Sequence, residues 1–517
     1  MNEDSIYSQL IVSKNGSTIP VLKNGKTIES RYDPQKESER FIQEQLDAAT
    51  SFVIIFGIGG GALIQAALKQ NPNLFIIAVE ESQSDLDFLL QIELVKELKN
   101  NPKVRLCNST ELYNTILDNY MPAFYGNLKV IENRSWVNEN KETAQKLTAI
   151  IQKAVPVVAA DFSVQSHFGK LWMHNILSNL KTLDKTVAVP SFKNELNKTA
   201  VVFAAGPTLD SSIELVQKKP GDYFCIATDT AFSVLVSKNI IPQAVISLDG
   251  QYVSSSHFIH NSAQDEQFSD TVFLFDLSGN TSAVKGLIKN KNKVSCFISG
   301  HPLSTFVNQK YSLGLPQIYA GSGTVTIAAV DFAVKCGFTK INVLGADFAY
   351  VNSKPYAKGT YLDRLYNTAS TRLNGSAKAF STLQYRTPLT QTGNNSYTTD
   401  ILTAYRFSFC EYLKNAGLEY SNTNDIYEIK NPSGAKQTFD NSEFNKKKVS
   451  GTNLINHIIS DFKNHMQQNP ELKTISDLTI EDISLLPLIS WLRNNDNRKD
   501  GDFMYYYNKA AAYIQKF

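Results

Sequence analysis

Short, continuous runs of apolar residues alternate with amphipathic segments over most of the chain. Near the start, the run SFVIIFGIGGG is followed by the helical pattern ALIQAALKQ and then by a second run, LFIIAVEES. In the middle of the chain, amphipathic segments separate six further runs: TAVVFAAG, DYFCIATDT, QAVISLDG, TVFLFDL, KVSCFISG and KINVLGADF. Buried strands that alternate with helices are typical of parallel sheets covered on both faces. The pattern therefore predicts an α/β protein with two doubly wound, Rossmann-like domains.

Other patterns mark the ends of the chain and the segment after the last central strand. Asn15-Gly16 and Asn24-Gly25 separate short apolar runs, which predicts a hairpin. Residues 350–399 are rich in Asn, Thr, Tyr and Gly, which predicts a long functional loop. We expect an N-terminal α/β domain over residues 1–190, a central domain over 191–430 and a helical C-terminal domain over 431–517. Helices are predicted over residues 34–49, 142–155, 165–183, 209–218, 324–337 and 399–415, with three more after residue 452.

Composition limits the functional classes. The chain has 51 basic and 49 acidic residues, so its charge gives no reason to expect a nucleic acid partner. No two of the five cysteines have zinc-site spacing, and we expect them to be buried in a reducing compartment. The N-terminal sequence MNEDSIYSQL does not resemble a signal peptide, and no stretch contains the roughly 20 apolar residues of a membrane span. We therefore expect a cytoplasmic protein that does not enter a membrane; an oligomer is possible.

Glycines and polar residues follow the predicted central strands. Ligands of open α/β sheets bind beyond the carboxyl ends of the strands. The first strand is followed by Gly206, Pro207, Thr208 and Leu209, where a glycine and a helix start can admit a phosphate. Carboxylates at other strand ends can accept from a ribose hydroxyl or a base amine, although each of these residues also suits an ordinary turn or helix cap. The further candidates are Thr228, Asp229, Thr230, Asp249, Gly250, Gln251, Ser322, Gly323, Thr324, Asp347 and Phe348, followed by Tyr350 and Tyr356.

Two other patterns have alternative interpretations. The turn from Gly57 to Gly61, with Glu80 and Glu81 about 20 residues on, resembles a nucleotide or S-adenosylmethionine fingerprint. We favour a purely structural tight turn here, and therefore expect no tightly bound cofactor. His257 and His260 lie three residues apart without an apparent third metal ligand, so we expect them to be solvated loop residues and predict no metal site.

The order of several motifs resembles the motility-associated factor family, over roughly residues 50–430. The motifs are AGPTLD at 205–210, PQAVISLD at 242–249, GSGTVT at 321–326, GADFAY at 345–350 and, upstream, FGKLW at 168–172 with Asn175, Ile176, Leu177, Asn179 and Leu180. This resemblance implies a role in glycosylating flagellin with nonulosonic acids such as pseudaminic or legionaminic acid.

The central domain of that family in turn resembles bacterial sialyltransferases that use a CMP-sugar. In those enzymes a Gly-Pro-Ser-Leu turn contacts the nucleotide, a Ser/Gly segment opens a helix, and a Gly-x-Asp-Phe strand end precedes two tyrosines that hold the phosphate. Residues 206–209 match the first motif with Thr in place of Ser, residues 322–324 match the second loosely, and residues 345–356 resemble the third with one tyrosine displaced by one position. The resemblance therefore implies phosphate-binding roles for Tyr350 and Tyr356.

The resemblance supplies no catalytic base. The sialyltransferases use a histidine after this region, whereas no histidine lies between His301 and His457 here. The acceptor hydroxyl must still lose its proton. Asp249, Asp347 or Asp229 can take it, or the reaction needs no base.

We thus expect a glycosyltransferase that moves a nonulosonic acid from a CMP-activated donor to Ser or Thr of flagellin. The alternatives are a pterin pyrophosphokinase that uses ATP, because the same domain occurs in proteins assigned that activity, and a flagellin-binding protein without catalysis.

Overall fold

The computed structural model divides the chain into two compact units. The first contains Met1–Lys170 and Ile459–Phe517, and the second contains Leu171–Ile458. The structure describes residues 5–47, 49–259, 266–321, 323–423, 425–432, 450–468, 472, 474–496 and 502–517. The predicted boundaries at residues 190 and 430 do not coincide with this division, and each unit is described separately below.

The first unit contains a four-stranded parallel sheet in the order β5-β4-β3-β6. These strands are β3 (Phe52–Phe56), β4 (Phe75–Glu80), β5 (Val104–Asn108) and β6 (Leu128–Glu132). The predicted hairpin is confirmed as β1 (Tyr7–Val12) paired with β2 (Thr18–Leu22), and Gly16 in its turn has a φ of +89°. The helices are α1 (Pro34–Gln45), α2 (Ala62–Gln70), α3 (Gln83–Leu89), α4 (Glu93–Lys99), α5 (Leu112–Asn119), α6 (Pro122–Tyr125) and α7 (Arg134–Glu139).

The C-terminal helices form as predicted but belong to this first unit rather than to a domain of their own. The guanidinium of Arg493 donates to the carbonyls of Ala123 and Phe124 at 3.3 and 3.0 Å, and the Phe124 and Phe503 rings stack with centroids 4.2 Å apart. These contacts join residues more than 360 positions apart, so no local sequence pattern indicates them. The helices are α18 (Gly451–Gln468), which begins in the second unit, α19 (Ile480–Asn495) and α20 (Phe503–Gln515).

One long helix replaces two predicted ones. The segments predicted as helices over residues 142–155 and 165–183 are parts of a single helix, α8 (Lys141–Leu180), which continues through Pro156. A proline removes one hydrogen bond from a helix but need not end it. Among the described residues α8 is also long and apolar enough to cross a membrane by length and composition, although little of its apolar window is buried. A single helix of this kind is weak evidence for a membrane span.

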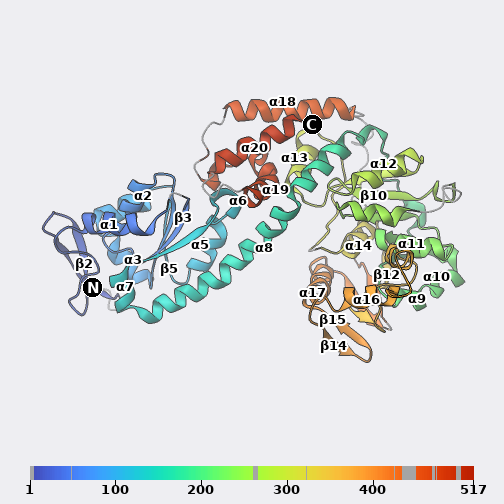
Figure 1. Cartoon of the computed structure of the whole chain (residues 1–517), viewed down its shortest axis with the longest axis horizontal. Helices are drawn as coiled ribbons and strands as arrows, with labels where there is room; N and C mark the ends of the chain where they lie inside the picture. Colours follow the sequence, from blue (N-terminus) through green and yellow to red (C-terminus); the bar gives the residue numbers. More distant parts are fainter. Residues whose placement is uncertain are drawn as a thin grey trace. The chain divides into compact units, whose positions relative to one another are not determined.

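The second unit is built on a sheet of eight described strands in the order β11-β10-β9-β8-β7-β12-β17-β16. Two of these strands, β10 and β12, are labelled in Figure 1. The first six are parallel and correspond to the six predicted central strands, which confirms the doubly wound fold. The chain runs outward from β7 to β11 and then returns to place β12 on the other side of β7. The strands are β7 (Thr199–Phe203), β8 (Tyr223–Thr228), β9 (Ala244–Ser247), β10 (Val272–Asp276), β11 (Lys293–Phe297), β12 (Lys340–Leu344), β16 (Glu419–Thr423) and β17 (Ile426–Lys430).

The two faces of this sheet carry separate apolar cores. Val202 lies in a core with Phe332 of α14, whereas its neighbour Val201 lies in a core with Phe232 of α11. Successive strand residues point to opposite faces, so an apolar strand needs helices on both sides. The helices of this unit are α9 (Leu209–Ser212), α10 (Glu214–Lys218), α11 (Asp229–Ser237), α12 (Thr281–Lys289), α13 (Pro302–Lys310), α14 (Val325–Cys336) and α17 (Asp400–Asn415), with the 3-10 helix η4 (Tyr252–Phe258).

The segment predicted as a long loop, residues 350–399, contains regular structure. It has two short helices, α15 (Tyr361–Thr368) and α16 (Ser376–Gln384), and a small antiparallel sheet of β13 (Tyr350–Val351), β14 (Thr390–Gly393) and β15 (Ser396–Thr398). These elements are short and mostly exposed, so they lack the buried apolar periodicity that identifies a helix or strand from sequence.

The prediction that the cysteines are buried holds for Cys107, Cys225, Cys296 and Cys336, whereas Cys410 is half-buried. All five are free thiols.

Candidate functional site

A cavity of about 430 Å³ opens where β7 and β12 lie side by side in the second unit. This is the point at which the order of the strands reverses, and ligands of doubly wound folds bind at such a switch point. The volume falls within the roughly 300–1,000 Å³ of small-molecule pockets. The strand ends contribute Gly206 after β7, Thr228 at the end of β8 with Asp229 directly after it, and Asp347 after β12.

Three helices begin at this cavity. Thr228, Thr324 and Thr399 are the N-caps of α11, α14 and α17, and each hydroxyl accepts from a backbone N–H of its own helix. All three threonines line the cavity. A side-chain cap satisfies one of the four free N–H groups at a helix start, and the helix dipole adds positive potential there. Three such ends around one cavity favour an anionic ligand.

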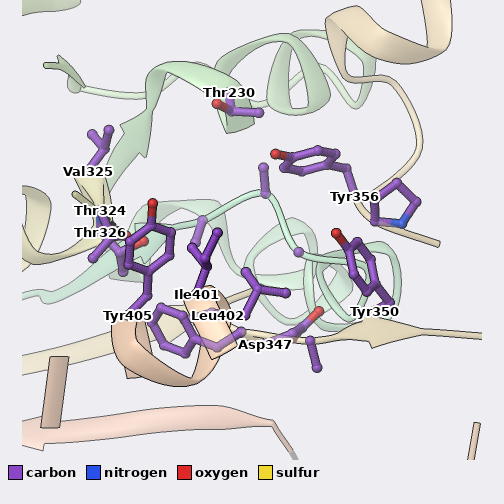
Figure 2. Close-up of a pocket in the computed structure, with 18 of the residues that line it drawn as sticks. Thr230, Thr324, Val325, Thr326, Asp347, Tyr350, Tyr356, Ile401, Leu402 and Tyr405 are labelled. Atoms are coloured by element: carbon purple, nitrogen blue, oxygen red, sulfur yellow. Dashed lines mark hydrogen bonds between the residues drawn. The ribbon is translucent and has the colours of Figure 1, made fainter. Parts of the chain in front are cut away.

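Tyrosines form two walls of the cavity. Figure 2 shows Tyr350 and Tyr356 together on one side and Tyr405 of α17 on the opposite side. Burial of its hydroxyl is the main cause that raises the pKa of Tyr356 to about 12, with Tyr361 and Tyr350 adding to it and the positive charge of Arg386 opposing it. Tyr356 is therefore a neutral hydrogen-bond donor at physiological pH. Arg386 lines the same cavity and is exposed.

The carboxylate of Asp347 holds the turn that follows β7. It accepts from the backbone N–H of Thr208 at 2.9 Å and also from the Thr208 hydroxyl. Gly206 is required beside it, because a Cβ atom there would lie 2.5 Å from both Asp347 Oδ2 and the Gly345 carbonyl. Burial is the first cause that raises the pKa of Asp347, and its bonds to Thr208 oppose this effect. Asp347 thus positions the Gly206–Leu209 turn.

Asp229 is fixed in a similar way at the start of α11. Its carboxylate accepts from the Thr230 N–H at 2.7 Å and from the Ser247 hydroxyl at 2.8 Å, and the residue is 2% exposed. The Thr228 hydroxyl donates to the carbonyl of Phe203, which ties the ends of β7 and β8 together. Asp229 therefore presents a carboxylate of fixed orientation to the cavity.

The backbone after β12 adopts a sparsely populated conformation at the cavity wall. Phe348 has a φ of +49°, and Asn352 and Ser353 follow with +51° and +58°. A bulky residue in this left-handed region costs about 1–3 kcal/mol and persists only where the surrounding structure enforces it. The Phe348 carbonyl accepts from Thr398 Oγ1 at 3.0 Å, which helps to hold this strained segment.

The predicted strand-end residues after β9 do not line the cavity. Asn175 of α8 donates to the carbonyls of Gly250 and Ser278 at 2.9 and 3.0 Å, so the loop after β9 is tied to α8 and to the loop after β10. Asp249 accepts from the Gln251 N–H, and burial is the main cause that raises its pKa. Asn179 likewise donates to the carbonyls of Leu277 and Gly279 at 2.9 and 3.0 Å, so both asparagines of the upstream motif anchor strand-end loops.

His257 is buried, contrary to the expectation of a solvated loop residue. It is 7% exposed, and its ring meets that of Tyr361 edge to face at 4.6 Å. Burial lowers the pKa of His257, while the charges of Asp229 and Asp249 act in the opposite direction. The expectation was wrong because the short 3-10 helix η4 packs this residue against α11 and α15. His260, the other member of the predicted pair, lies outside the described residues.

The cavity gathers most of the predicted site. Its lining includes Gly206, Thr228, Asp229, Thr230, Gly323, Thr324, Asp347, Phe348, Tyr350 and Tyr356. Pro207, Thr208, Leu209, Asp249, Gly250 and Gln251 are not part of the described lining, and Ser322 lies outside the described residues. Further lining residues that were not predicted individually are Thr326, Leu383, Arg386, Thr387, Thr399, Ile401, Leu402 and Tyr405. Of these, Thr399 had a usable signal, because it directly precedes a predicted helix and threonine is a common N-cap.

The glycine-rich turn of the first unit is filled by side chains of its own chain. Glu80 accepts from the Ile58 N–H at 2.7 Å and from Trp136 Nε1 at 2.9 Å, and Glu29 accepts from the Gly60 N–H at 2.8 Å. A Cβ atom at Gly57 would lie 2.4 Å from the Trp136 ring. The N–H groups that would face a cofactor phosphate are thus bonded to carboxylates of the protein.

The fold and the cavity define an α/β protein with an anion-favouring ligand site at the switch point of a doubly wound sheet. Residues 172–353 match the family model described as "6-hydroxymethylpterin diphosphokinase MptE-like". Three proteins of Treponema pallidum (strain Nichols), each described as an uncharacterized protein, are similar to the chain. They are 37% identical over 142 residues, 35% over 144 and 26% over 230, which is 27%, 27% and 44% of this chain and 67%, 51% and 47% of theirs.

A solved structure, "Structure of MAf glycosyltransferase from Magnetospirillum magneticum AMB-1", aligns with a TM-score of 0.48 at 13% identity, over 98% of this chain and 85% of that one. The chain belongs to the same family as the first of the Treponema proteins, and its central domain is MptE-like. The match to the MptE-like model bears out the predicted resemblance.

Proposed function

We propose that the chain is a glycosyltransferase that moves a nonulosonic acid from a CMP-activated donor to Ser or Thr of flagellin. The observation that carries this proposal is the switch-point cavity, where three helix N-termini, Arg386 and the hydroxyls of Tyr350 and Tyr356 meet. A CMP-sugar has one phosphate that must be held in the ground state and stabilised as it leaves. Neutral donors and a cation around a partly enclosed cavity suit that task.

The role proposed for each side chain follows from its position in the cavity. The start of α14, with Thr324, and the side chain of Arg386 would bind the phosphate, and Tyr356 would donate to the oxygen on which leaving-group charge grows. The fixed carboxylate of Asp229 would face either the nucleoside, where it would accept from a ribose hydroxyl or from the cytosine amine, or the acceptor hydroxyl. Tyr356 and Arg386 lie outside the region that matches the MptE-like model, which ends at residue 353. Part of the phosphate-binding wall would therefore be supplied by the segment after that region.

The transfer breaks the bond between the anomeric carbon and the phosphate oxygen and forms one to the acceptor oxygen, whose proton must go to a base. Of the three predicted carboxylates, Asp229 and Asp347 line the cavity and Asp249 does not. We assign the proton to one of these two. An activity that survives in Asp229→Asn but not in Asp347→Asn would select Asp347, and the opposite result would select Asp229.

Calorimetry tests the donor site. CMP should bind with an affinity that cytidine, which lacks the phosphate, does not reach, and Arg386→Gln should weaken CMP about tenfold or more, since hydrogen bonds to charged groups contribute about 1.5–3 kcal/mol. Arg372→Gln is the matched control, because it removes the same charge from an exposed position outside the described cavity lining. Equal binding of CMP and cytidine would contradict a phosphate site.

Mass spectrometry of flagellin tests the whole proposal. Flagellin from a strain that lacks this gene should lose the mass of a nonulosonic acid at its modified serines and threonines, and the wild-type gene should restore it. Restoration by the Tyr350→Phe, Tyr356→Phe double variant at the wild-type level would remove the tyrosines from the mechanism.

The match to the MptE-like model supports a second candidate, a pyrophosphokinase that transfers diphosphate from ATP to a hydroxymethylpterin. Incubation with ATP, magnesium and 6-hydroxymethyl-7,8-dihydropterin distinguishes the two. Formation of AMP and pterin diphosphate would favour this candidate over the transferase.

A further inference from the structure

A groove of about 510 Å³ lies between α15 and α16 in the second unit. Its lining includes Tyr366 of α15, Gly375 at the start of α16, and Lys378 and Leu383 of α16, and most of its surface is apolar. The rings of Tyr366 and Phe380 meet edge to face at 4.8 Å, which packs the two helices against each other. The sequence motifs and the roles proposed for the donor cavity assign no function to this groove.

The groove joins the cavity in which the donor is proposed to bind. Leu383 and Arg386 line both of them. For transfer to occur, the acceptor hydroxyl must lie within about 3–3.5 Å of the carbon that it attacks. A molecule held in the groove would therefore extend to the mouth of the donor cavity, where an acceptor has to arrive.

The groove is too open to be a small-molecule site of the usual kind. Asn374, Gly375, Lys378 and Arg386, which all line it, are exposed. Small-molecule pockets bury roughly 70–90% of the surface of their ligands, which a groove between exposed residues does not do. A polypeptide segment suits it better, because such a segment can place apolar side chains in the groove and make further contacts beyond it.

Apolar side chains beside the groove are left exposed. Leu365, Leu373 and Tyr385 are each next in the sequence to a lining residue, and they are 50%, 90% and 67% exposed. Single exposed apolar side chains are normal on a protein surface, whereas several beside one apolar groove are typical of a protein-binding surface.

The segment that forms the groove is also strongly basic. Lys378 lines the groove but not the described part of the donor cavity, so the anionic donor does not account for its charge. Its only printed bond is to the neutral Asn374 side chain at 3.0 Å. This excess of positive charge favours a partner with acidic side chains. Residues 350–399 contain six basic residues and one acidic residue, which are Lys354, Lys358, Arg364, Arg372, Lys378 and Arg386 against Asp363.

We infer that the groove between α15 and α16 binds the acceptor polypeptide, through a segment with apolar and acidic side chains beside the serine or threonine to be modified. Apolar side chains of that segment pack against Tyr366, and a carboxylate pairs with Lys378. The hydroxyl reaches the donor cavity past Leu383 and Arg386. This role rests on the proposed transferase function, to which it adds the place where the acceptor binds.

Gly375 allows the groove to be filled without strain. A Cβ atom there would meet no atom within 4 Å, and the residue has a φ of −73°, which any residue can adopt. Gly375→Trp should therefore keep the wild-type affinity for CMP in calorimetry. Its affinity for unmodified flagellin, purified from a strain that lacks this gene and measured by interferometry with the full chain, should fall about tenfold or more, since a central contact is lost.

Lys378→Glu is a second, independent variant, which decides the question if Gly375→Trp fails to fold. It should weaken flagellin binding about tenfold at low ionic strength and less in high salt, because it reverses a charge at the edge of the contact. Gly221→Trp is the matched control and should keep both affinities. Gly221 lies between α10 and β8, is exposed, and would also give its Cβ no neighbour within 4 Å, but it is outside the described lining of both sites.

Wild-type affinity for flagellin in both groove variants, or no measurable binding of flagellin by the wild type, would overturn the inference. So would self-association of the chain that Gly375→Trp abolishes, because a second copy would then be the occupant. Failure of the donor proposal gives a different result. The wild type would then bind flagellin through the groove without binding CMP, which supports the groove and contradicts the transferase.

Discussion

The two glutamates that fill the glycine-rich turn should make the stability of the first unit depend on pH. Glu29 and Glu80 are 7% and 0% exposed. Burial is the main cause that raises the pKa of each from its ordinary value of 4.5 to about 7, against the lowering effect of the N–H groups of Gly60 and Ile58 that bond them. Both carboxylates thus bind protons more tightly in the folded chain than in the unfolded one.

The sign and size of the effect follow from proton linkage. A group whose pKa is higher in the folded state adds stability below its unfolded value, 4.5, and loses that contribution as the pH rises through about 7. Between pH 5.5 and pH 8.5 the contribution of each glutamate to the free energy of unfolding should therefore fall by about 2 kcal/mol, or about 4 kcal/mol for the pair. For a unit of this size, that corresponds to a fall in Tm of about 8–16 °C.

Scanning calorimetry at constant ionic strength from pH 5.5 to 8.5 measures this fall. Glu29→Gln keeps an oxygen that can accept from Gly60 but no longer titrates, so it should remove about half of the pH dependence. Glu81→Gln, one residue after Glu80 and only half-buried, is the control and should keep the wild-type slope. If the slope of Glu29→Gln equals that of the wild type, the pKa of Glu29 is not raised as its burial implies.

Three further predictions concern other parts of the chain. Gly206→Ala should destabilise the second unit by about 1–3 kcal/mol in urea unfolding, because the new Cβ would crowd Asp347 and the Gly345 carbonyl. An unchanged unfolding midpoint would contradict the packing described for this turn. Tyr350→Phe and Tyr356→Phe should keep the wild-type Tm within about 2 °C while lowering flagellin modification, and a large fall in Tm would show that the hydroxyls serve folding instead. S-adenosylmethionine, NAD and FAD at millimolar concentration should give no thermal shift, because Glu29 and Glu80 already bond the N–H groups of the glycine turn. A saturable shift that Glu80→Ala or Glu81→Ala abolishes would show a working cofactor site.

The central sheet was predictable because each strand is a short apolar run bounded by glycine or polar residues. The same logic placed Gly206, Asp229 and Asp347 at one edge, since parallel strands end on the same side. Asp249 follows a strand in the same way, yet it lies outside the described lining. Asp249 differs from Asp229 because β9 is separated from the switch point by β8. The apolar pattern does not indicate the order of the strands in the sheet.

Other features depend on contacts between distant segments. Glu29, which fills the glycine turn, lies in the loop between β2 and α1, and no spacing relates it to Gly60. Arg386 follows a short, mostly exposed helix in a polar segment. In such a segment the sequence does not distinguish an arginine of the site from an ordinary surface arginine. The assembly of α19 and α20 with the first unit rests on Arg493 and Phe503, whose partners lie near residue 124.

The bond between Thr208 and Asp347 spans 139 positions, and it has a consequence for how the cavity comes into being during synthesis. Strands β7 to β11 can pair in the order in which they leave the ribosome, each beside its predecessor. The switch point exists only after β12 has inserted on the free side of β7, and the wall with Tyr405 follows still later. Closing such a long loop is slow compared with pairing neighbours. The edge of β7 that faces β12 therefore stays unpaired until β12 has been synthesised. The ligand site is consequently among the last features of the unit to form.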